Sequence, residues 1–199
     1  MEYAIPSHLK LNLTLRVMGK RPDGLHDIYS LFLLLRGAES LVIRAPAPGK
    51  KDLVRVYNYP VNGQNIVLKV LCLLRSLGLD PGPLEIEILK SVPPETGLGA
   101  GSGNGAALIG WARTTLGFDF PRSAERKIGS DIPFFCSGYE MGRVTKAGEM
   151  VESLGNALPL STLVLVPRWR SETAAAYRTL DEEAGRVPVA EMEAAEQCD

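Results

Sequence analysis

The sequence has few cysteines, no long apolar run and no block of charge of one sign. Its three cysteines, Cys72, Cys136 and Cys198, are odd in number and widely spaced, which argues against a disulfide framework and against a CxxC metal or redox site. Nowhere do about 18 apolar residues follow one another, and the N-terminus has no basic stretch before an apolar core. We therefore expect a cytoplasmic protein with no membrane partner.

An excess of basic residues is missing as well. Lys and Arg number 22 against 23 Asp and Glu, and no basic run exceeds two residues. Domains that bind nucleic acids usually carry a basic patch or stripe, so we expect no nucleic-acid partner. With 199 residues, 45% of them apolar, the chain can form one domain, or one domain and part of another.

Alternation of apolar and polar residues predicts strands in the first half of the chain. Residues 9–17 have Leu or Val at every second position, the period of a half-buried strand, so Lys10 and Asn12 share one face. A helix is predicted at 64–77, before Gly78. Further strands are predicted at 28–35, 41–44, 53–57 and 84–90.

The second half of the chain mixes helices and strands. An alanine-rich helix is predicted from near Ser102 to near Gly117, after a glycine-rich loop. Strands are predicted at 139–146 and 162–166, and helices at 171–183 and 189–196. Since strands and helices do not alternate strictly, we expect an α+β fold rather than a doubly wound sheet.

The glycine-rich loop is the clearest functional signal. Residues 97–105 read GLGAGSGNG, and glycine at five of nine positions lets backbone N–H groups approach an anion closely. The helix that follows would direct the positive end of its dipole at that anion. The loop matches neither GxxxxGK[ST] nor GxGxxG in register. Phosphate is the natural ligand, and a loop or compact turn without a ligand is the alternative.

Three segments resemble, in order, the motifs of the galactokinase, homoserine kinase, mevalonate kinase and phosphomevalonate kinase (GHMP) superfamily. PPETGLGAGSGNGAA is similar to its central glycine motif, and IGSDIPFF to its catalytic segment. The opening HLKLNLTLRVMGKRPDGLHDIYSLF resembles its first strand with Lys-x-Asn, followed by a DGxH segment. That DGxH segment is typical of the members that act on a cytidyl substrate.

The resemblance implies a function and a fold. The enzyme would transfer the γ-phosphate of ATP to the 2-hydroxyl of 4-diphosphocytidyl-2-C-methyl-D-erythritol, in the non-mevalonate isoprenoid pathway. The fold would have two domains, the first like domain 2 of ribosomal protein S5, with the site between them. We expect the first domain at 1–155 and the beginning of the second at 156–199, in a monomer or weak homodimer.

Phosphoryl transfer needs a carboxylate that accepts the proton of the substrate hydroxyl, and Asp131 in IGSDIPFF is the candidate. The alternative for Asp131 is a turn cap. A buried Lys10 near Asp131 would keep that carboxylate ionised and stabilise charge on the transferred phosphoryl group. The alternative for Lys10 is a solvated strand lysine.

The resemblance also assigns binding residues. Asn12 would orient the substrate, and His26 would contact the cytosine, with a structural histidine whose hydrogen bonds are satisfied as the alternative. Asn65 matches an asparagine on the adenine side, or is a plain helix N-cap. Ser102 would contact phosphate or Mg²⁺, which is expected with a triphosphate. The nucleotide would further be contacted by Pro94, Gly97, Leu98, Gly99, Ala100, Gly101, Gly103 and Asn104.

The sequence departs from the superfamily pattern at several positions. Leu25 replaces an aromatic that would stack on cytosine, Gly103 replaces a serine, and Ala100 replaces a glycine. The chain ends at Asp199 without a later glycine-rich motif. We expect the second domain to be incomplete, either by truncation or because stretches are missing from the sequence, and favour the second.

Two other functions remain open. One is a GHMP kinase for a mevalonate-like substrate or an amino-acid alcohol, because of Leu25 and the imperfect glycine loop. The other is a catalytically inactive nucleotide-binding module, because of the missing C-terminal motif.

Overall fold

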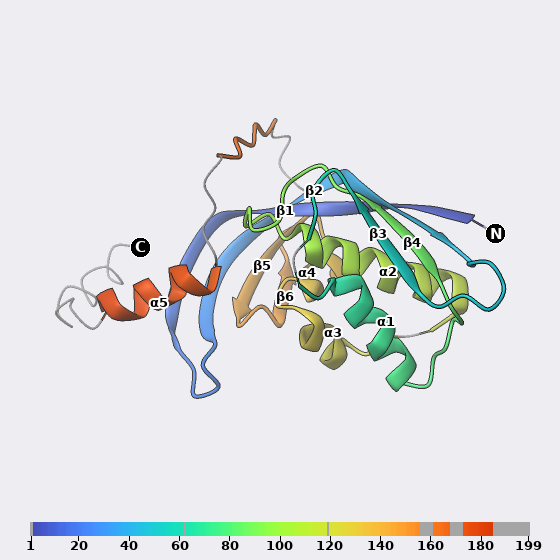
Figure 1. Cartoon of the computed structure of the whole chain (residues 1–199). Coiled ribbons are helices and arrows are strands. Elements are labelled where there is room, and N and C mark those ends of the chain that lie inside the picture. Colours follow the sequence, from blue (N-terminus) through green and yellow to red (C-terminus); the bar gives the residue numbers. More distant parts are fainter. Residues whose placement is uncertain (1, 62, 119, 156–160, 168–172, 185–199) are drawn as a thin grey trace.

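The computed structural model describes residues 2–61, 63–118, 120–155, 161–167 and 173–184. Two strands of 19 residues each, β1 (Glu2–Lys20) and β2 (His26–Arg44), form a long antiparallel hairpin. The hairpin crosses the whole molecule as the curved blue ribbon of Figure 1. It is the frame on which the other elements are placed.

The sheet is built around β2. β4 (Glu85–Leu89) pairs with the second half of β2 and β5 (Met141–Lys146) with its first half, both antiparallel. β3 (Leu53–Tyr57) is parallel to β4, and β6 (Met150–Ser153) is antiparallel to β5. The order is β3-β4-β2-β5-β6, with β1 along the other side of β2.

One face of the sheet is covered by helices (Figure 1). They are α1 (Ile66–Ser76), α2 (Ala100–Leu116), α3 (Arg122–Ile128) and α4 (Ile132–Ser137). α5 (Thr173–Ala184) lies apart from them, beside the turn end of the hairpin, where Asp181 contacts Lys20 and His26. None of the helices in the described ranges is long and apolar enough to cross a membrane.

The core lies between the sheet and the first two helices. Fully buried Leu41 and Ile43 of β2 and Ile86 and Ile88 of β4 contact this layer from the sheet side. The helices contribute Val67, Val70, Leu71 and Leu74 from α1 and Leu108, Ile109, Trp111 and Ala112 from α2. Burying such side chains stabilises a fold by about 1.5–3 kcal/mol each, which anchors α2 firmly to the sheet.

The mixed sheet with helices on one face confirms the predicted α+β class, but one strand boundary was wrong. The strands predicted at 28–35 and 41–44 are parts of the single strand β2. Between them β2 bulges at 36–38, where Gly37 has φ of 61° and its N–H donates to His8 Nδ1 at 2.8 Å. The side chain of His8 thus satisfies the backbone group that the bulge removes from the ladder.

Further differences lie in the second half. The strand predicted at 162–166 is wrong, because residues 161–167 pair with no described strand and leave Leu163 84% and Leu165 81% exposed. Three short elements, α3, α4 and β6, were not predicted. The helix predicted at 171–183 corresponds to α5, and the one at 189–196 lies outside the described residues.

Candidate active site

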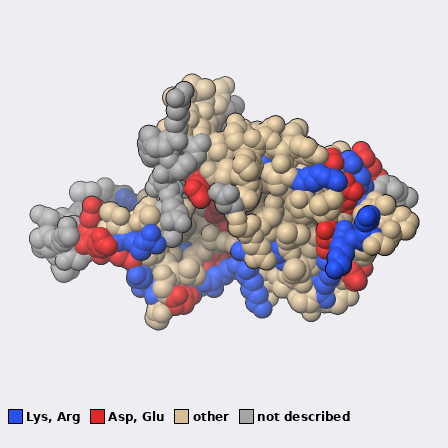
Figure 2. Space-filling model, viewed as in Figure 1, with Lys and Arg blue, Asp and Glu red and all other residues tan. Residues whose placement is uncertain are grey.

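A cavity of about 990 Å³ lies between β1, the glycine-rich loop and the N-terminal ends of α2 and α4. Figure 2 shows this face hollowed between the main body and the part that carries α5, with acidic and basic side chains interspersed around it. One wall is the loop from Pro93 to Gly99 and the first turn of α2. The opposite wall includes residues 164–167 and Tyr177 of α5.

The first turn of α2 presents backbone donors to the cavity. Its N-cap is Gly99, with φ of 65°, no side chain caps the turn, and no acidic residue lies in it. The first intrahelical bond runs from Gly103 N to Gly99 O at 2.8 Å. The N–H groups of residues 100–102 therefore precede the helical ladder. Together with the helix dipole, these groups suit an anion. The phosphate site stays a prediction.

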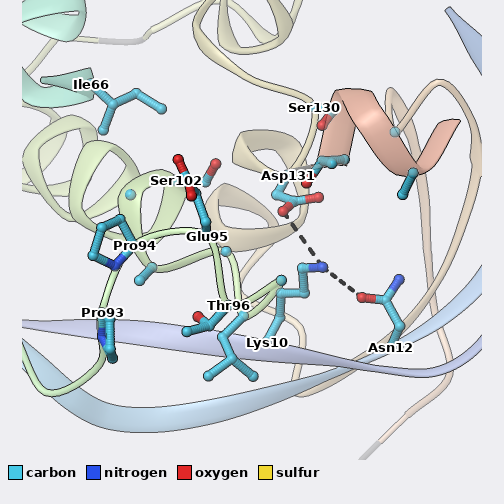
Figure 3. A pocket seen from close by; sticks show the side chains of 18 of the residues that line it. Lys10, Asn12, Ile66, Pro93, Pro94, Glu95, Thr96, Ser102, Ser130 and Asp131 are labelled. Atoms are coloured by element: carbon cyan, nitrogen blue, oxygen red, sulfur yellow. Dashed lines mark hydrogen bonds and ion pairs between the residues drawn. The ribbon is translucent and has the colours of Figure 1, made fainter. Parts of the chain in front are cut away.

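Lys10 and Asp131 face each other beside that turn (Figure 3). Lys10 Nζ lies 3.7 Å from Asp131 Oδ2, and their side chains are 8% and 23% exposed. Asp131 is the N-cap residue of α4, yet its side chain makes no capping hydrogen bond. The predicted alternative of a turn cap is therefore not what the side chain does.

Strands β1 and β2 hold Lys10 in place. Its ammonium group donates to Asn12 Oδ1 at 2.5 Å, and Asn12 Nδ2 donates to Ser30 Oγ at 3.0 Å. The ammonium also lies 4.8 Å from the centre of the Phe32 ring, a favourable position for a cation. Lys10 and Asn12 do share a face, as the period-2 pattern predicts, and Lys10 is buried rather than solvated.

Gly99 is the point at which the loop approaches the charged pair. A Cβ at this position would lie 3.1 Å from Asp131 Oδ2, from Lys10 Cγ and from Phe135 Cε2. Lys10 N also donates to Leu98 O at 2.9 Å. The strand that carries the lysine and the loop that carries the anion site are thus in direct contact.

Two predicted nucleotide residues face elsewhere or are already bonded. A Cβ on Gly103 would lie 2.0 Å from the carbonyl oxygen of His8, so Gly103 is turned toward β1. Asn104 is 3% exposed, and its amide donates to Ser7 Oγ and Glu39 Oε2, both at 2.9 Å. Close packing against β1 explains the glycine that replaces the superfamily serine.

The other predicted nucleotide residues lie around the cavity. Asn65 lines it and also caps α1, accepting a bond from Val67 N at 2.9 Å, so the two alternatives for Asn65 are compatible. The lining includes Pro94, Gly97, Leu98, Gly99, Ala100, Gly101 and Ser102. Of these, Pro94 and Ser102 are labelled in Figure 3.

The two residues predicted to recognise cytosine lie at the hairpin turn, outside the cavity lining. Leu25 is 46% exposed. His26 Nε2 lies 2.6 Å from Asp181 Oδ1, and its ring stacks on that of Tyr177 with centroids 4.6 Å apart. Since Tyr177 lines the cavity, His26 reaches the site through that ring.

Tyr177 and Asp181 are site-adjacent residues that the sequence did not reveal. Burial, and then the Asp131 carboxylate, raise the pKa of Tyr177. Hydrogen bonds from Lys20 and then His26 lower the pKa of Asp181. Their spacing of four on a predicted helix was the available signal, because it places both side chains on one face.

Comparison with known proteins places this architecture in a class. Residues 65–139 match the model of the GHMP kinases N terminal domain. A crystal structure of 4-(cytidine 5'-diphospho)-2C-methyl-D-erythritol kinase superposes with a TM-score of 0.60 and 29% identity, over 80% of this chain and 56% of that one. The chain belongs to the GHMP kinase superfamily.

Curated relatives narrow the likeness within that class. The chain is 36% identical to the chloroplastic 4-diphosphocytidyl-2-C-methyl-D-erythritol kinase of Arabidopsis thaliana, over 87% of this chain and 47% of that protein. It is 34% identical to the kinase of the same name from Protochlamydia amoebophila (strain UWE25), over 88% of this chain and 62% of that protein. The chain thus spans about half the length of these curated relatives.

More distant structures share the fold alone. Lactococcus lactis galactokinase, solved in complex with galactose, superposes with a TM-score of 0.52 at 12% identity, over 94% of this chain and 58% of that one. The superposition on 4-(cytidine 5'-diphospho)-2C-methyl-D-erythritol kinase and the family match agree with the predicted GHMP-kinase fold. The boundary at 155/156 stays a prediction.

Proposed function

We propose that the chain is the nucleotide-binding part of an ATP-dependent kinase that phosphorylates the 2-hydroxyl of 4-diphosphocytidyl-2-C-methyl-D-erythritol. The observation that carries the proposal is the Lys10–Asp131 pair, 3.7 Å apart, beside the open first turn of α2 in one cavity. The named relatives at 30–36% identity support the substrate.

In the proposed reaction Asp131 accepts the proton of the attacking hydroxyl and holds its oxygen in line with the γ-phosphate. Lys10, whose Nζ lies 3.7 Å from Asp131 Oδ2, offsets negative charge on the phosphoryl group. Asn12, whose Oδ1 accepts from Lys10 Nζ at 2.5 Å, keeps that ammonium group on the cavity side of β1. The amides of residues 100–102 bind phosphate oxygens.

The cavity lining fits a magnesium nucleotide. Ser102 and Glu95 both line the cavity and provide hydroxyl and carboxylate oxygens, the donors that Mg²⁺ takes up alongside phosphate oxygens. Mg²⁺ bound there would supply positive charge that offsets the charge of the phosphate groups. We propose that Ser102 is the residue that holds it.

The base-recognition end of the substrate site supports the proposal less strongly than the phosphate end. The stacked rings of His26 and Tyr177 form an aromatic surface beside the cavity, which suits a planar base. Leu25 is exposed and lies outside the cavity lining. For that reason a GHMP kinase with a mevalonate-like or amino-acid alcohol substrate is the second candidate.

A coupled assay of ADP release tests the proposal. The chain is supplied with MgATP and, in separate reactions, with the cytidyl substrate, mevalonate and homoserine. We expect ADP release with the cytidyl substrate above the rate without acceptor. Preferential turnover of mevalonate or homoserine overturns the substrate assignment in favour of the second candidate. Binding of MgATP without turnover of any acceptor indicates a nucleotide-binding module.

A further inference from the structure

A buried polar cluster, separate from the Lys10–Asp131 pair, lies behind the first turns of α2. Lys90 Nζ donates to Glu39 Oε2 at 2.7 Å, with the two side chains 3% and 0% exposed. Asn104 joins them, accepting from Lys90 Nζ at 3.3 Å and donating to Glu39 Oε2 and to Ser7 Oγ at 2.9 Å each. We call Ser7, Glu39, Lys90 and Asn104 the anchor network.

Every member of the anchor network comes from a different element. Ser7 is on β1, Glu39 on β2, Lys90 just after β4, and Asn104 on α2. Glu39 Oε1 also accepts from Ser91 N at 3.2 Å, where the chain starts toward the glycine-rich loop. The network therefore joins the start of that loop, the helix after it and the hairpin that carries Lys10.

The same stretch of β1 contacts the loop and helix at successive points. Ser7 bonds Asn104, the backbone of His8 packs on Gly103, and Lys10 N donates to Leu98 O. These contacts set the register between β1 and the glycine-rich segment. A shift of one residue along β1 would turn Lys10 to the opposite face of the strand.

We propose that the anchor network positions the phosphate-binding turn relative to the Lys10–Asp131 pair, so its members are positioning residues for the nucleotide. The inference rests on the proposed function. Lys90 and Asn104 line the cavity wall, but their polar atoms are engaged in the network. They act on the nucleotide through the backbone of residues 98–102.

The charge of the network distinguishes positioning from mere stabilisation. A buried ion pair contributes little net stability compared with a well-packed apolar pair, while its directional bonds can fix one arrangement. Replacing both charges with apolar residues should therefore leave the fold stable and loosen the register. If the network were purely structural, the same replacement would leave MgATP affinity unchanged.

Helix α2 offers a matched control at its other end. Arg113 Nη2 donates to Glu125 Oε1 at 2.7 Å, and the two side chains are 28% and 3% exposed. This second ion pair also ties α2 to a neighbouring element, but none of its residues lines the cavity. Removing this ion pair shows whether a general destabilisation of α2, without a change in its register against β1, is enough to weaken nucleotide binding.

The test compares MgATP affinity, by titration calorimetry, for the unchanged chain, Lys90→Met/Glu39→Leu and Arg113→Met/Glu125→Leu. Titrations are run well below the lowest Tm. We expect about tenfold weaker binding for Lys90→Met/Glu39→Leu, because small misplacements of binding groups are costly, and unchanged binding for Arg113→Met/Glu125→Leu. Unchanged affinity in both variants, or equal loss in both, overturns the inference alone. No MgATP binding by the unchanged chain overturns the proposed function and the inference with it.

Should Lys90→Met/Glu39→Leu fail to fold, single hydroxyl deletions take its place. Ser7→Ala removes one bond of Asn104, and Thr114→Ala removes a bond of 3.0 Å to Gly110 O further along α2. We expect about threefold weaker MgATP binding for Ser7→Ala only, the effect of one net hydrogen bond. Equal affinities of the two variants overturn the inference.

Discussion

The N-terminal and C-terminal ends of α2 differ in what surrounds them. The first turn begins at Gly99 without a side-chain cap and opens on the cavity. From its midpoint on, the helix buries Leu108, Ile109 and Trp111 and ends at Gly117, whose N–H bonds back to Ala112 O. Arg113 also donates to Phe120 O at 2.8 Å beyond the helix.

This difference shows how one helix can combine a firm anchor with an open binding end. Apolar burial at the C-terminal end stabilises the helix whether or not its first amides are satisfied. The first turn is then free to keep its donors for a ligand. Substitutions at the two ends should therefore affect different measurements, and the following predictions test this.

The largest effect is expected at the N-terminal side, from Asp131→Asn. The amide is nearly isosteric but cannot accept the proton, so kcat should fall by roughly 10²- to 10⁴-fold while MgATP affinity stays nearly unchanged. Steady-state kinetics with the cytidyl substrate and calorimetry with MgATP measure the two quantities.

Lys10→Met is the companion variant, because both side chains serve the same transition state. The double variant should lose less activity than the product of the two single losses. Near-normal kcat for Asp131→Asn in a chain that turns over substrate would show that Asp131 is not the base.

At the C-terminal side, Leu108→Ala should lower the free energy of unfolding by about 2–5 kcal/mol, the usual cost of a buried cavity. Leu108 is 0% exposed in the core. Urea denaturation measures the loss, and MgATP affinity of the folded protein should not change. Leu116→Ala, at a side chain that is 39% exposed, is the control, with a loss of about 0.5 kcal/mol or less. Equal losses would contradict the burial pattern.

Gly103→Ser restores the superfamily residue and should nevertheless destabilise this chain. The new Cβ would approach the His8 carbonyl to 2.0 Å, and such overpacking costs about 1–3 kcal/mol. Thermal and urea denaturation measure the change. The control is Gly110→Ser on the same helix, where an added Cβ meets nothing within 4 Å. If Gly103→Ser were as stable as the unchanged chain, the backbone of β1 at His8 would be able to move away from α2 at little cost.

The smallest effect is expected for Gly101→Asp, which places a carboxylate in the first turn of α2. The nearest atom to a Cβ there is Ile66 Cγ2 at 3.9 Å, so the substitution fits and acts through charge. MgATP affinity should fall about tenfold, roughly 1.4 kcal/mol, with a smaller effect at high salt. Gly110→Asp introduces the same charge away from the cavity and should bind MgATP normally. Unchanged affinity for Gly101→Asp would show that the loop is structural.

The sequence predicted those site residues that belong to a local sequence pattern. The alternation at 9–17 placed Lys10 and Asn12 on one face, and the glycine run placed the open turn at the start of α2. Neither required knowledge of distant contacts. The prediction that Asp131 lies near Lys10 depended on the superfamily likeness, because no local pattern relates residues so far apart in sequence.

Elements defined by tertiary contacts were missed for the same reason. The polar stretch of α3 is helical because Ala124, Glu125 and Ile128 turn inward, with Glu125 bonded to Arg113. From the sequence alone, a short polar segment that contains a glutamate is predicted to be a loop. The anchor network was equally invisible, since its members lie on separate elements and bond only in the folded chain.

Gly99 limits how this sequence can drift over generations. An alanine at Gly101 would meet only the Ile66 Cγ2 methyl group at 3.9 Å, so a small uncharged side chain fits there. At Gly99 a single added methyl group would press on Asp131, Lys10 and Phe135 at once, in a backbone conformation with φ of 65° that disfavours any side chain. In a library that samples every residue at both positions, we expect survivors of a growth selection to vary at Gly101 and to keep glycine at Gly99.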